Sequence, residues 1–125
     1  MLSKHDEMKE KGNECIRQKM YQKAAGYYAA ALQDSPSSHT VYSNRSLAYS
    51  KLRKFDLALE DANKCIELVP NFARGYLRRS IALTGLGEYE LAMTAAEEGY
   101  KLRGSDTICH NCVTQWLEAN EVLLN

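Results

Sequence analysis

Apolar and small residues recur along this chain at the three- and four-residue intervals that are typical of amphipathic helices. The middle of the chain shows the pattern in two successive segments: Tyr42, Leu47, Ala48, Tyr49 and Leu52, then Leu57, Ala58, Cys65 and Ile66. The pattern breaks at Lys19-Met20, Arg53-Lys54 and Gly87-Glu88, and again near Pro36, Pro70 and Gly104. The sequence therefore predicts an all-α chain of short helices arranged in pairs.

The helical pattern repeats with a period of about 34 residues, a length typical of helix-pair repeats. One column of the repeat holds Ala24, Ala58 and Ala92. Three further columns are aromatic or small: Tyr21, Phe55 and Tyr89; Gly12, Ser46 and Ser80; Ala31, Cys65 and Gly99. Short side chains allow two antiparallel helices to approach closely, and we expect the aromatic residue to fill the turn between them. The period defines three units, at residues 5–38, 39–72 and 73–106.

The last segment of the chain has no partner helix. Residues 107–125 carry an apolar stripe made of Ile108, Cys112, Val113, Trp116, Leu117 and Leu123. A single helix pair cannot bury its apolar face, so stacked pairs need a cover at their end. We therefore expect residues 107–125 to form a capping helix, and residues 1–125 to form one domain.

Composition excludes several classes of function. The 125 residues contain 16 Lys and Arg against 16 Asp and Glu, and this balance argues against a general binder of nucleic acids or membrane surfaces. The sequence has no apolar run long enough to span a bilayer, and its charged start does not resemble a secretory signal. We therefore expect a cytoplasmic protein, monomeric as a domain, whose four cysteines are reduced.

The repeat resembles the tetratricopeptide repeat family over about residues 5–106. The residues that carry the resemblance are Gly12, Ala24, Tyr28, Ala31 and Pro36, then Tyr49, Ala58 and Pro70, and finally Ala92. The resemblance implies a right-handed superhelix of three helix pairs followed by a capping helix. It also implies that the first helix of each pair lines a concave face that binds peptides.

Polar residues of the predicted first helices point to a ligand with several anionic oxygens. Lys9 and Asn13 are four residues apart, as are Arg74 and Arg78, so each pair lies on one side of its helix. Asn44 lies in the first helix of the second unit. Any one of these residues alone is usually solvated surface, but together they offer donors from three units to one groove.

The same five positions are similar to the carboxylate clamp of tetratricopeptide co-chaperones, such as the heat-shock organising co-chaperones. That clamp has Lys and Asn in the first repeat, Asn in the second, and Lys and Arg in the third. Arg74 stands where Lys is usual, and its forked guanidinium differs from an ammonium in contact geometry. The resemblance implies an adaptor that binds the C-terminal Glu-Glu-Val-Asp tail of cytosolic heat-shock chaperones of the Hsp70 and Hsp90 classes.

Two further sets of residues are predicted to line the peptide groove. Ile16 and Leu47 lie one turn beyond the two asparagines and could form an apolar pocket for the valine of the tail. The second set continues the same faces and would read upstream residues, or simply pack: Ser50, Lys51, Leu77 and Ile81.

Other functions have weaker support in the sequence. Cys109 and Cys112 form a single CxxC pair, whereas a structural zinc site needs four ligands, so we expect no metal, no cofactor and no enzymatic activity. The main alternative is a repeat scaffold that binds an internal segment of its partner. Such a scaffold would not depend on a free C-terminal carboxylate.

Overall fold

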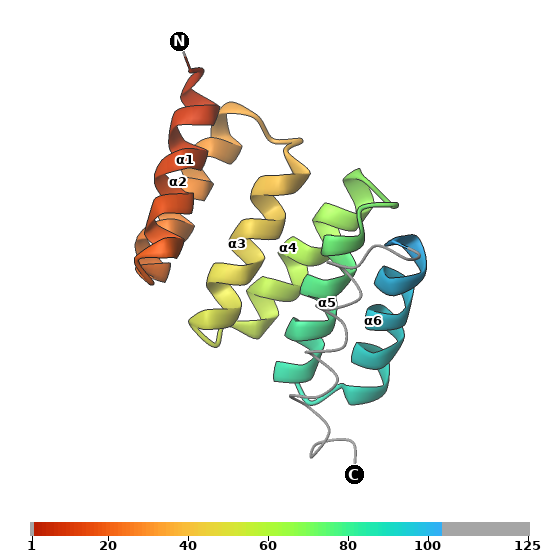
Figure 1. The fold of residues 1–125 in the computed structure, drawn as a ribbon. Helices are drawn as coiled ribbons and strands as arrows, with labels where there is room; N and C mark the ends of the chain where they lie inside the picture. The colour runs from red at the N-terminus through yellow and green to blue at the C-terminus, as the bar shows by residue number, and fades with distance from the viewer. Residues whose placement is uncertain (1, 104–125) are drawn as a thin grey trace.

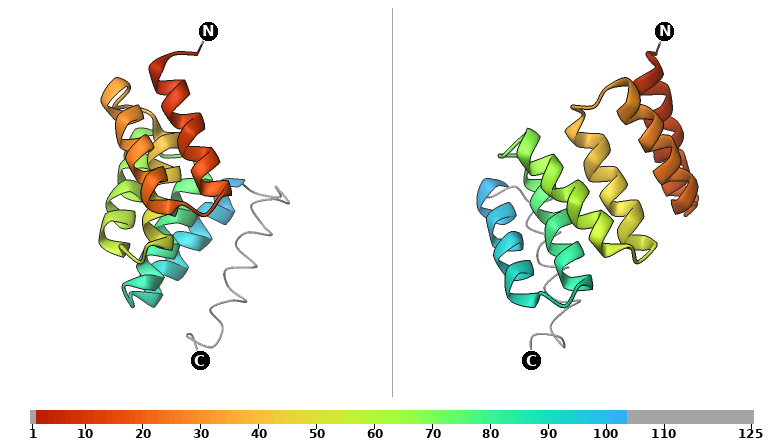
Figure 2. Two further views of the ribbon diagram at one scale, coloured as in Figure 1. Left: turned by 90° about the vertical axis from the view of Figure 1, so that its left-hand side faces the viewer. Right: turned by 180° about the vertical axis from the view of Figure 1, so that it is seen from behind.

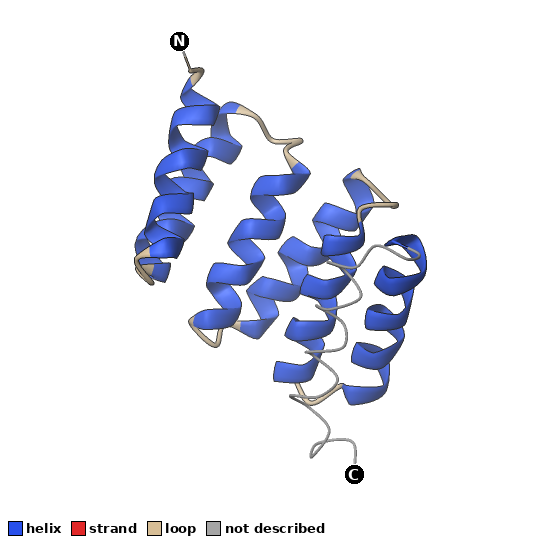
Figure 3. Ribbon diagram, in the orientation of Figure 1, coloured by secondary structure: helices blue, strands red, loops and turns tan. Residues whose placement is uncertain are grey.

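The computed structural model describes residues 2–103, which form six α-helices and no strand (Figures 1 and 3). The helices are α1 (Lys4–Arg17), α2 (Tyr21–Asp34), α3 (His39–Lys51), α4 (Phe55–Leu68), α5 (Ala73–Gly85) and α6 (Tyr89–Arg103). The predicted paired helices and the three predicted breaks within the pairs are thus confirmed. The expected capping helix at residues 107–125 lies outside the described residues and stays a prediction, as does the single domain over residues 1–125.

The turn within each pair has the same backbone conformation. Lys19, Arg53 and Gly87, which are one repeat period apart, all have a positive φ, of 60°, 62° and 82°. In each turn the next amide N–H donates to a carbonyl five residues back, for example from Met20 to Cys15 at 2.7 Å. This left-handed residue ends the first helix and reverses the chain. Only the third turn has glycine there, so the first two turns form despite a steric cost of roughly 1–2 kcal/mol each.

The three pairs stack side by side, as Figure 1 and the rotated views of Figure 2 show. Each helix packs against its partner within the pair, and α2 and α4 each pack against the first helix of the next pair. The first helices also contact one another, α1 with α3 and α3 with α5. The first helices therefore form the inner layer of the stack, the layer expected to carry the site.

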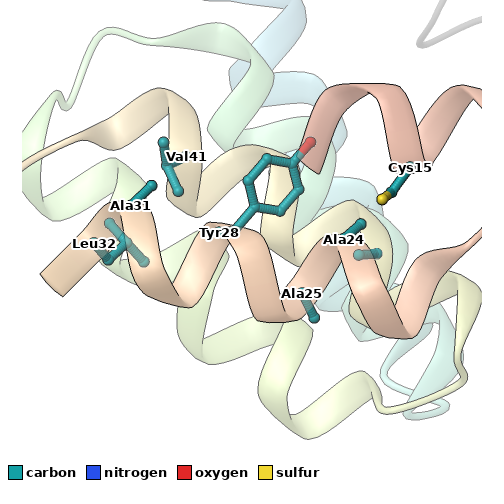
Figure 4. Close-up of a cluster of buried hydrophobic side chains, with 8 residues drawn as sticks. Cys15, Ala24, Ala25, Tyr28, Ala31, Leu32 and Val41 are labelled. Atoms are coloured by element: carbon teal, nitrogen blue, oxygen red, sulfur yellow. The ribbon is translucent and has the colours of Figure 1, made fainter. Parts of the chain in front are cut away.

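The core is built mainly from small side chains. Ala24, Ala58 and Ala92, the alanine column of the repeat, are all fully buried. In the first pair, Tyr28 is the largest fully buried side chain, and it lies among Cys15, Leu32 and several alanines (Figure 4). The close helix approach predicted from the small columns is thus confirmed.

The aromatic column behaves differently in the third pair. Tyr21 packs against the first core, and the ring of Phe55 lies directly against Gly85 of the following pair. Tyr89, in contrast, is 36% exposed, and its neighbour Leu91 is 56% exposed. Tyr89 is therefore the most exposed of the three aromatic residues, and the expectation that such a residue fills every turn is met less fully there.

A buried ion pair joins the two helices of the second pair. The Arg45 guanidinium on α3 donates from Nε and one Nη to the two carboxylate oxygens of Asp61 on α4, both at 2.8 Å. The guanidinium also lies 5.7 Å from the ring centroids of Tyr42 and of Tyr49. Burial raises the pKa of the Asp61 carboxyl, and the hydrogen bonds from Arg45 oppose that rise.

We predict opposite effects from two glycine-to-alanine substitutions. A Cβ on Gly12 would lie 2.5 Å from the buried ring of Tyr28, so Gly12→Ala should lower the free energy of unfolding by about 1–3 kcal/mol. A Cβ on Gly26, in the middle of α2, would meet no atom within 4 Å, so Gly26→Ala should raise it by roughly 0.5–1 kcal/mol. Urea denaturation of both variants tests this, and equal effects would contradict the close contact.

We also predict a pH-dependent loss of stability when Arg45 is removed. Arg45→Met leaves the Asp61 carboxylate buried without a partner, which should cost about 3–5 kcal/mol at pH 7. The pKa of Asp61 then rises further, so the folded state holds a proton that the unfolded state releases above about pH 4. The loss should therefore grow as the pH rises from 4 to 7. Arg53→Met, at an exposed turn, is the control and should show no such slope in thermal unfolding.

Candidate functional site

Two of the three inner helices, α3 and α5, carry an excess of positive charge, whereas α1 has as many acidic as basic residues. Together α3 and α5 contain five basic residues and no acidic one: Arg45, Lys51, Arg74, Arg78 and Arg79. The outer helix α4 has four acidic residues and one lysine. A chain with no net charge thus has a basic excess on two inner helices and an acidic excess on α4.

Asn13 and Asn44 meet at the centre of the inner layer. The Asn44 Nδ2 group on α3 donates to Asn13 Oδ1 on α1 at 3.1 Å. The Tyr28 hydroxyl on α2 donates to the same oxygen at 2.6 Å. Because Oδ1 accepts both hydrogen bonds, the Nδ2 group is the part of the Asn13 amide that remains to donate to a ligand.

A pocket of about 270 Å³ opens beside the two asparagines. Its lining residues come from the first three helices: Asn13, Ile16, Arg17, Tyr28, Asn44 and Leu47. The structure therefore brings together both predicted asparagines and both residues predicted for an apolar subsite. The pocket combines amide donors with an aliphatic wall, which suits a small apolar side chain next to an anionic group.

Arg78 approaches this centre from the third pair. Its Nε donates to the carbonyl oxygen of Ser43 on α3 at 3.2 Å. Burial raises the pKa of Tyr28 to about 12, and the charges of Arg17 and Arg78 act against that rise. Arg78 and Asn44 are one repeat period apart, which explains why they occupy matching places on neighbouring helices.

Lys9 and Arg74 lie one helical turn before Asn13 and Arg78. Lys9 is half-buried and has no ion pair with the described residues. Arg74 is exposed, and its guanidinium carbon lies 6.0 Å from the ring centroid of Phe72. No direct contact joins Lys9 or Arg74 to the asparagine centre within the described chain, so these two cations flank the centre and do not form part of it.

The four residues predicted to read upstream positions lie outside the pocket of about 270 Å³. Lys51 is exposed in the last turn of α3, whereas the hydroxyl of Ser50 is buried and unpaired. Leu77 is half-buried on α5. Ile81 packs against the core of the third pair, which favours the packing interpretation for that residue.

Two residues of the pocket were missed by the sequence analysis, Tyr28 and Arg17. The sequence did contain a signal for Tyr28: the same column of the repeat holds the small residues Ala62 and Ala96 in the other two units, so a large polar-tipped residue is unusual there. Arg17 lies at the rim, where its guanidinium pairs with Glu14 at 2.6 Å. Arg17 also had a signal, because Lys51, a predicted groove residue, stands one repeat period after it.

The described residues contain no group of three or more His, Cys, Asp or Glu side chains that could hold a metal ion. Cys15 and Cys65 are buried free thiols, and burial raises the pKa of Cys65 to about 11. Cys109 and Cys112 lie outside the described residues. Over the same described range, no helix has the length and apolar character needed to cross a membrane.

The paired helices, their regular repeat and the polar inner groove together define a helical-repeat domain. The sequence profile of the tetratricopeptide repeat family matches residues 39–72. The chain is 43% identical over 96 residues to an Hsp70-Hsp90 organizing protein of Triticum aestivum, and 42% identical over 96 residues to the heat shock protein sti1 homolog of Schizosaccharomyces pombe. Each alignment covers 77% of this chain but only 16% of the relative.

Solved structures agree with this family. The Sgt2 TPR domain of Aspergillus fumigatus superposes with a TM-score of 0.86 at 28% identity, covering 98% of this chain and 80% of that one. The TPR2B domain of yeast Sti1 in complex with an Hsp70 peptide gives 0.79 at 28% identity, over 90% of this chain and 98% of that one. The first TPR of Spaghetti (RPAP3), bound to the HSP90 peptide SRMEEVD, gives 0.81 at 28% identity, over 93% and 92%.

The chain is therefore a tetratricopeptide repeat domain, similar to those of the Hsp70-Hsp90 organizing proteins. A superhelix of the opposite hand would not superpose on these structures, so the predicted all-α fold is confirmed together with its hand. The chain spans 16% of the length of the curated relatives it matches, so activities of those whole proteins do not transfer by similarity alone.

Proposed function

We propose that this domain is a peptide-binding co-chaperone adaptor that binds the C-terminal Glu-Glu-Val-Asp tail of cytosolic Hsp70 or Hsp90 chaperones. The observation that carries the proposal is the contact of Asn13 with Asn44 beside a small pocket, with Arg78 reaching toward the same centre. Two similar domains hold Hsp70 or HSP90 peptides in their solved structures, and this supports the choice of ligand.

In this proposal the terminal aspartate of the tail lies at the five predicted clamp residues: Lys9, Asn13, Asn44, Arg74 and Arg78. Its main-chain and side-chain carboxylates accept hydrogen bonds from the amides and cations, each contributing roughly 1.5–3 kcal/mol. The preceding valine enters the pocket between Ile16 and Leu47. Because ordering a flexible tail offsets part of this gain, we expect a dissociation constant on the order of micromolar.

The proposed role requires binding and no chemical reaction. The domain would act in the cytoplasm as a connection between a chaperone and whatever the rest of its protein carries.

A calorimetric titration of the domain with Met-Glu-Glu-Val-Asp tests the proposal directly. The free-acid peptide should bind much more tightly than the same peptide with an amidated C-terminus. Equal binding of both peptides would favour a scaffold that recognises an internal segment.

We predict different effects from two neighbouring arginines of α5. Arg78 reaches toward the inner layer, whereas Arg79 donates to Asn63 Oδ1 on the outer helix α4 at 2.9 Å. Arg78→Ala should therefore weaken binding of the free-acid peptide more than about 30-fold, equivalent to at least about 2 kcal/mol. Arg79→Ala removes the same charge and should weaken binding less than threefold. Fluorescence anisotropy with a labelled peptide measures both.

The circular dichroism spectrum of each arginine variant provides the control for folding. Equal losses of affinity, with a steep dependence on salt in both variants, would indicate general electrostatic attraction and contradict a specific clamp.

We further predict that Asn13→Asp abolishes binding without unfolding the domain. An aspartate oxygen can still accept the hydrogen bonds from Tyr28 and Asn44, but the amide donor is replaced by a negative charge facing an anionic ligand. Asn63→Asp adds the same charge on the outer helix beside Arg79, and should leave the affinity nearly unchanged. Retained binding by Asn13→Asp in a folded domain would remove Asn13 from the clamp.

A further inference from the structure

The Tyr28 hydroxyl stands at the centre of the pocket without belonging to the predicted clamp. Tyr28 is fully buried, and Figure 4 shows its ring inside the first core with the hydroxyl oxygen directed at α1. That hydroxyl donates to Asn13 Oδ1 at 2.6 Å. The inference that follows rests on the proposed function and concerns how the same site distinguishes an anionic ligand from a neutral one.

We propose that Tyr28 is a positioning residue that makes the pocket selective for a free carboxylate by fixing the orientation of the Asn13 amide. A primary amide can flip end for end and present either its oxygen or its Nδ2 group to a ligand. Two donors, Tyr28 and Asn44, fix the oxygen on the protein side. The ligand therefore meets N–H groups, which bind a carboxylate oxygen and offer no acceptor to a C-terminal amide.

The hydroxyl can hold this orientation at any pH at which the domain works. Burial raises the pKa of Tyr28 to about 12, so the hydroxyl keeps its proton and remains a donor. Asn44 alone is less restrictive, because its own amide can turn together with that of Asn13 and exchange the roles of donor and acceptor. The Tyr28 oxygen could accept from a turned amide, but Tyr28 is fully buried and its hydroxyl has no other hydrogen-bond partner among the described residues. Turning the Asn13 amide would therefore leave the hydroxyl proton buried without an acceptor, which is costly.

The neighbouring glycine makes the contact possible. Gly12 has no side chain, and a Cβ there would lie 2.5 Å from the Tyr28 ring, so the ring reaches α1 only because this position is glycine. The second and third units hold Ala62 and Ala96 at the column of Tyr28, with Ser46 and Ser80 at the column of Gly12. Among the three helix pairs, the hydroxyl is therefore supplied by the first alone.

The test compares two tyrosine-to-phenylalanine variants with two peptides. Free-acid and amidated Met-Glu-Glu-Val-Asp are titrated into the wild-type domain, into Tyr28→Phe and into Tyr27→Phe. Tyr27 is the adjacent residue on α2, half-buried, with its ring centroid 5.9 Å from the Lys11 ammonium, so it serves as a matched control. Loss of one hydrogen bond to a neutral group should weaken free-acid binding by roughly 2- to 12-fold.

The decisive quantity is the ratio of the two affinities. In Tyr28→Phe we expect free-acid binding to fall while amidated binding stays equal or improves, so that the preference for the free acid shrinks. Tyr27→Phe should keep the wild-type preference. A Tyr28→Phe domain that loses affinity for both peptides equally would overturn the positioning role. If the wild-type domain itself shows no preference, the proposed function fails, which is a distinguishable outcome.

A measurement on the wild-type domain keeps the inference testable if Tyr28→Phe does not fold. A hydroxyl proton that is buried and hydrogen-bonded exchanges slowly enough to give its own NMR signal. That signal should show only a weak nuclear Overhauser effect to the Asn13 Nδ2 protons, because the hydroxyl proton is directed at Oδ1 and not at the amide nitrogen. A strong nuclear Overhauser effect between them would mean the reverse orientation and would overturn the inference.

Discussion

Close approach of the two helices within each pair is the constraint on which the rest of this structure depends. The fully buried alanines of the repeat allow this approach, and in the first pair Gly12 lets the Tyr28 ring pass against α1. Without short side chains at these columns, the helices would move apart and the left-handed turns at Lys19 and Arg53 would no longer close. The groove exists because three such pairs stack with their first helices in contact.

The same stacking gives the domain its electrostatic character. The regular repeat places every first helix in the inner layer, and α3 and α5 bring a basic excess there. Of these basic residues, Arg45 pairs with Asp61 and Arg79 donates to Asn63, both on α4. The acidic residues of α4 lie mostly on the outer layer, and one of them, Asp61, is used inside to hold Arg45. The net charge of the chain therefore does not describe its surface, whereas the distribution of charged residues over the inner and outer helices does.

Much of the fold and part of the site could be predicted from the sequence. The period and the turns follow from spacing, because residues one period apart take matching places in a stack. The convergence of Asn13 and Asn44 was expected only from their place on neighbouring first helices, since they are 31 residues apart. Spacing does not determine how exposed each aromatic residue is, and Tyr89 is more exposed than Tyr21 and Phe55. Nor does it reveal that Tyr28 would share an acceptor with Asn44, since that depends on side-chain rotamers and on a single buried hydroxyl.

Two adjacent residues of α1 connect the packing of the fold to the geometry of the site. Gly12 receives the ring of Tyr28, and Asn13, the next residue, receives its hydroxyl. Any change that shifts α2 along α1 would move the hydroxyl away from Asn13 before it opened the core, because a hydrogen bond of 2.6 Å tolerates less displacement than apolar packing does. The proposed orientation of the site is thus more sensitive to the helix spacing than the fold is, and under that proposal a destabilising substitution in the first pair would reduce ligand selectivity before it unfolded the domain.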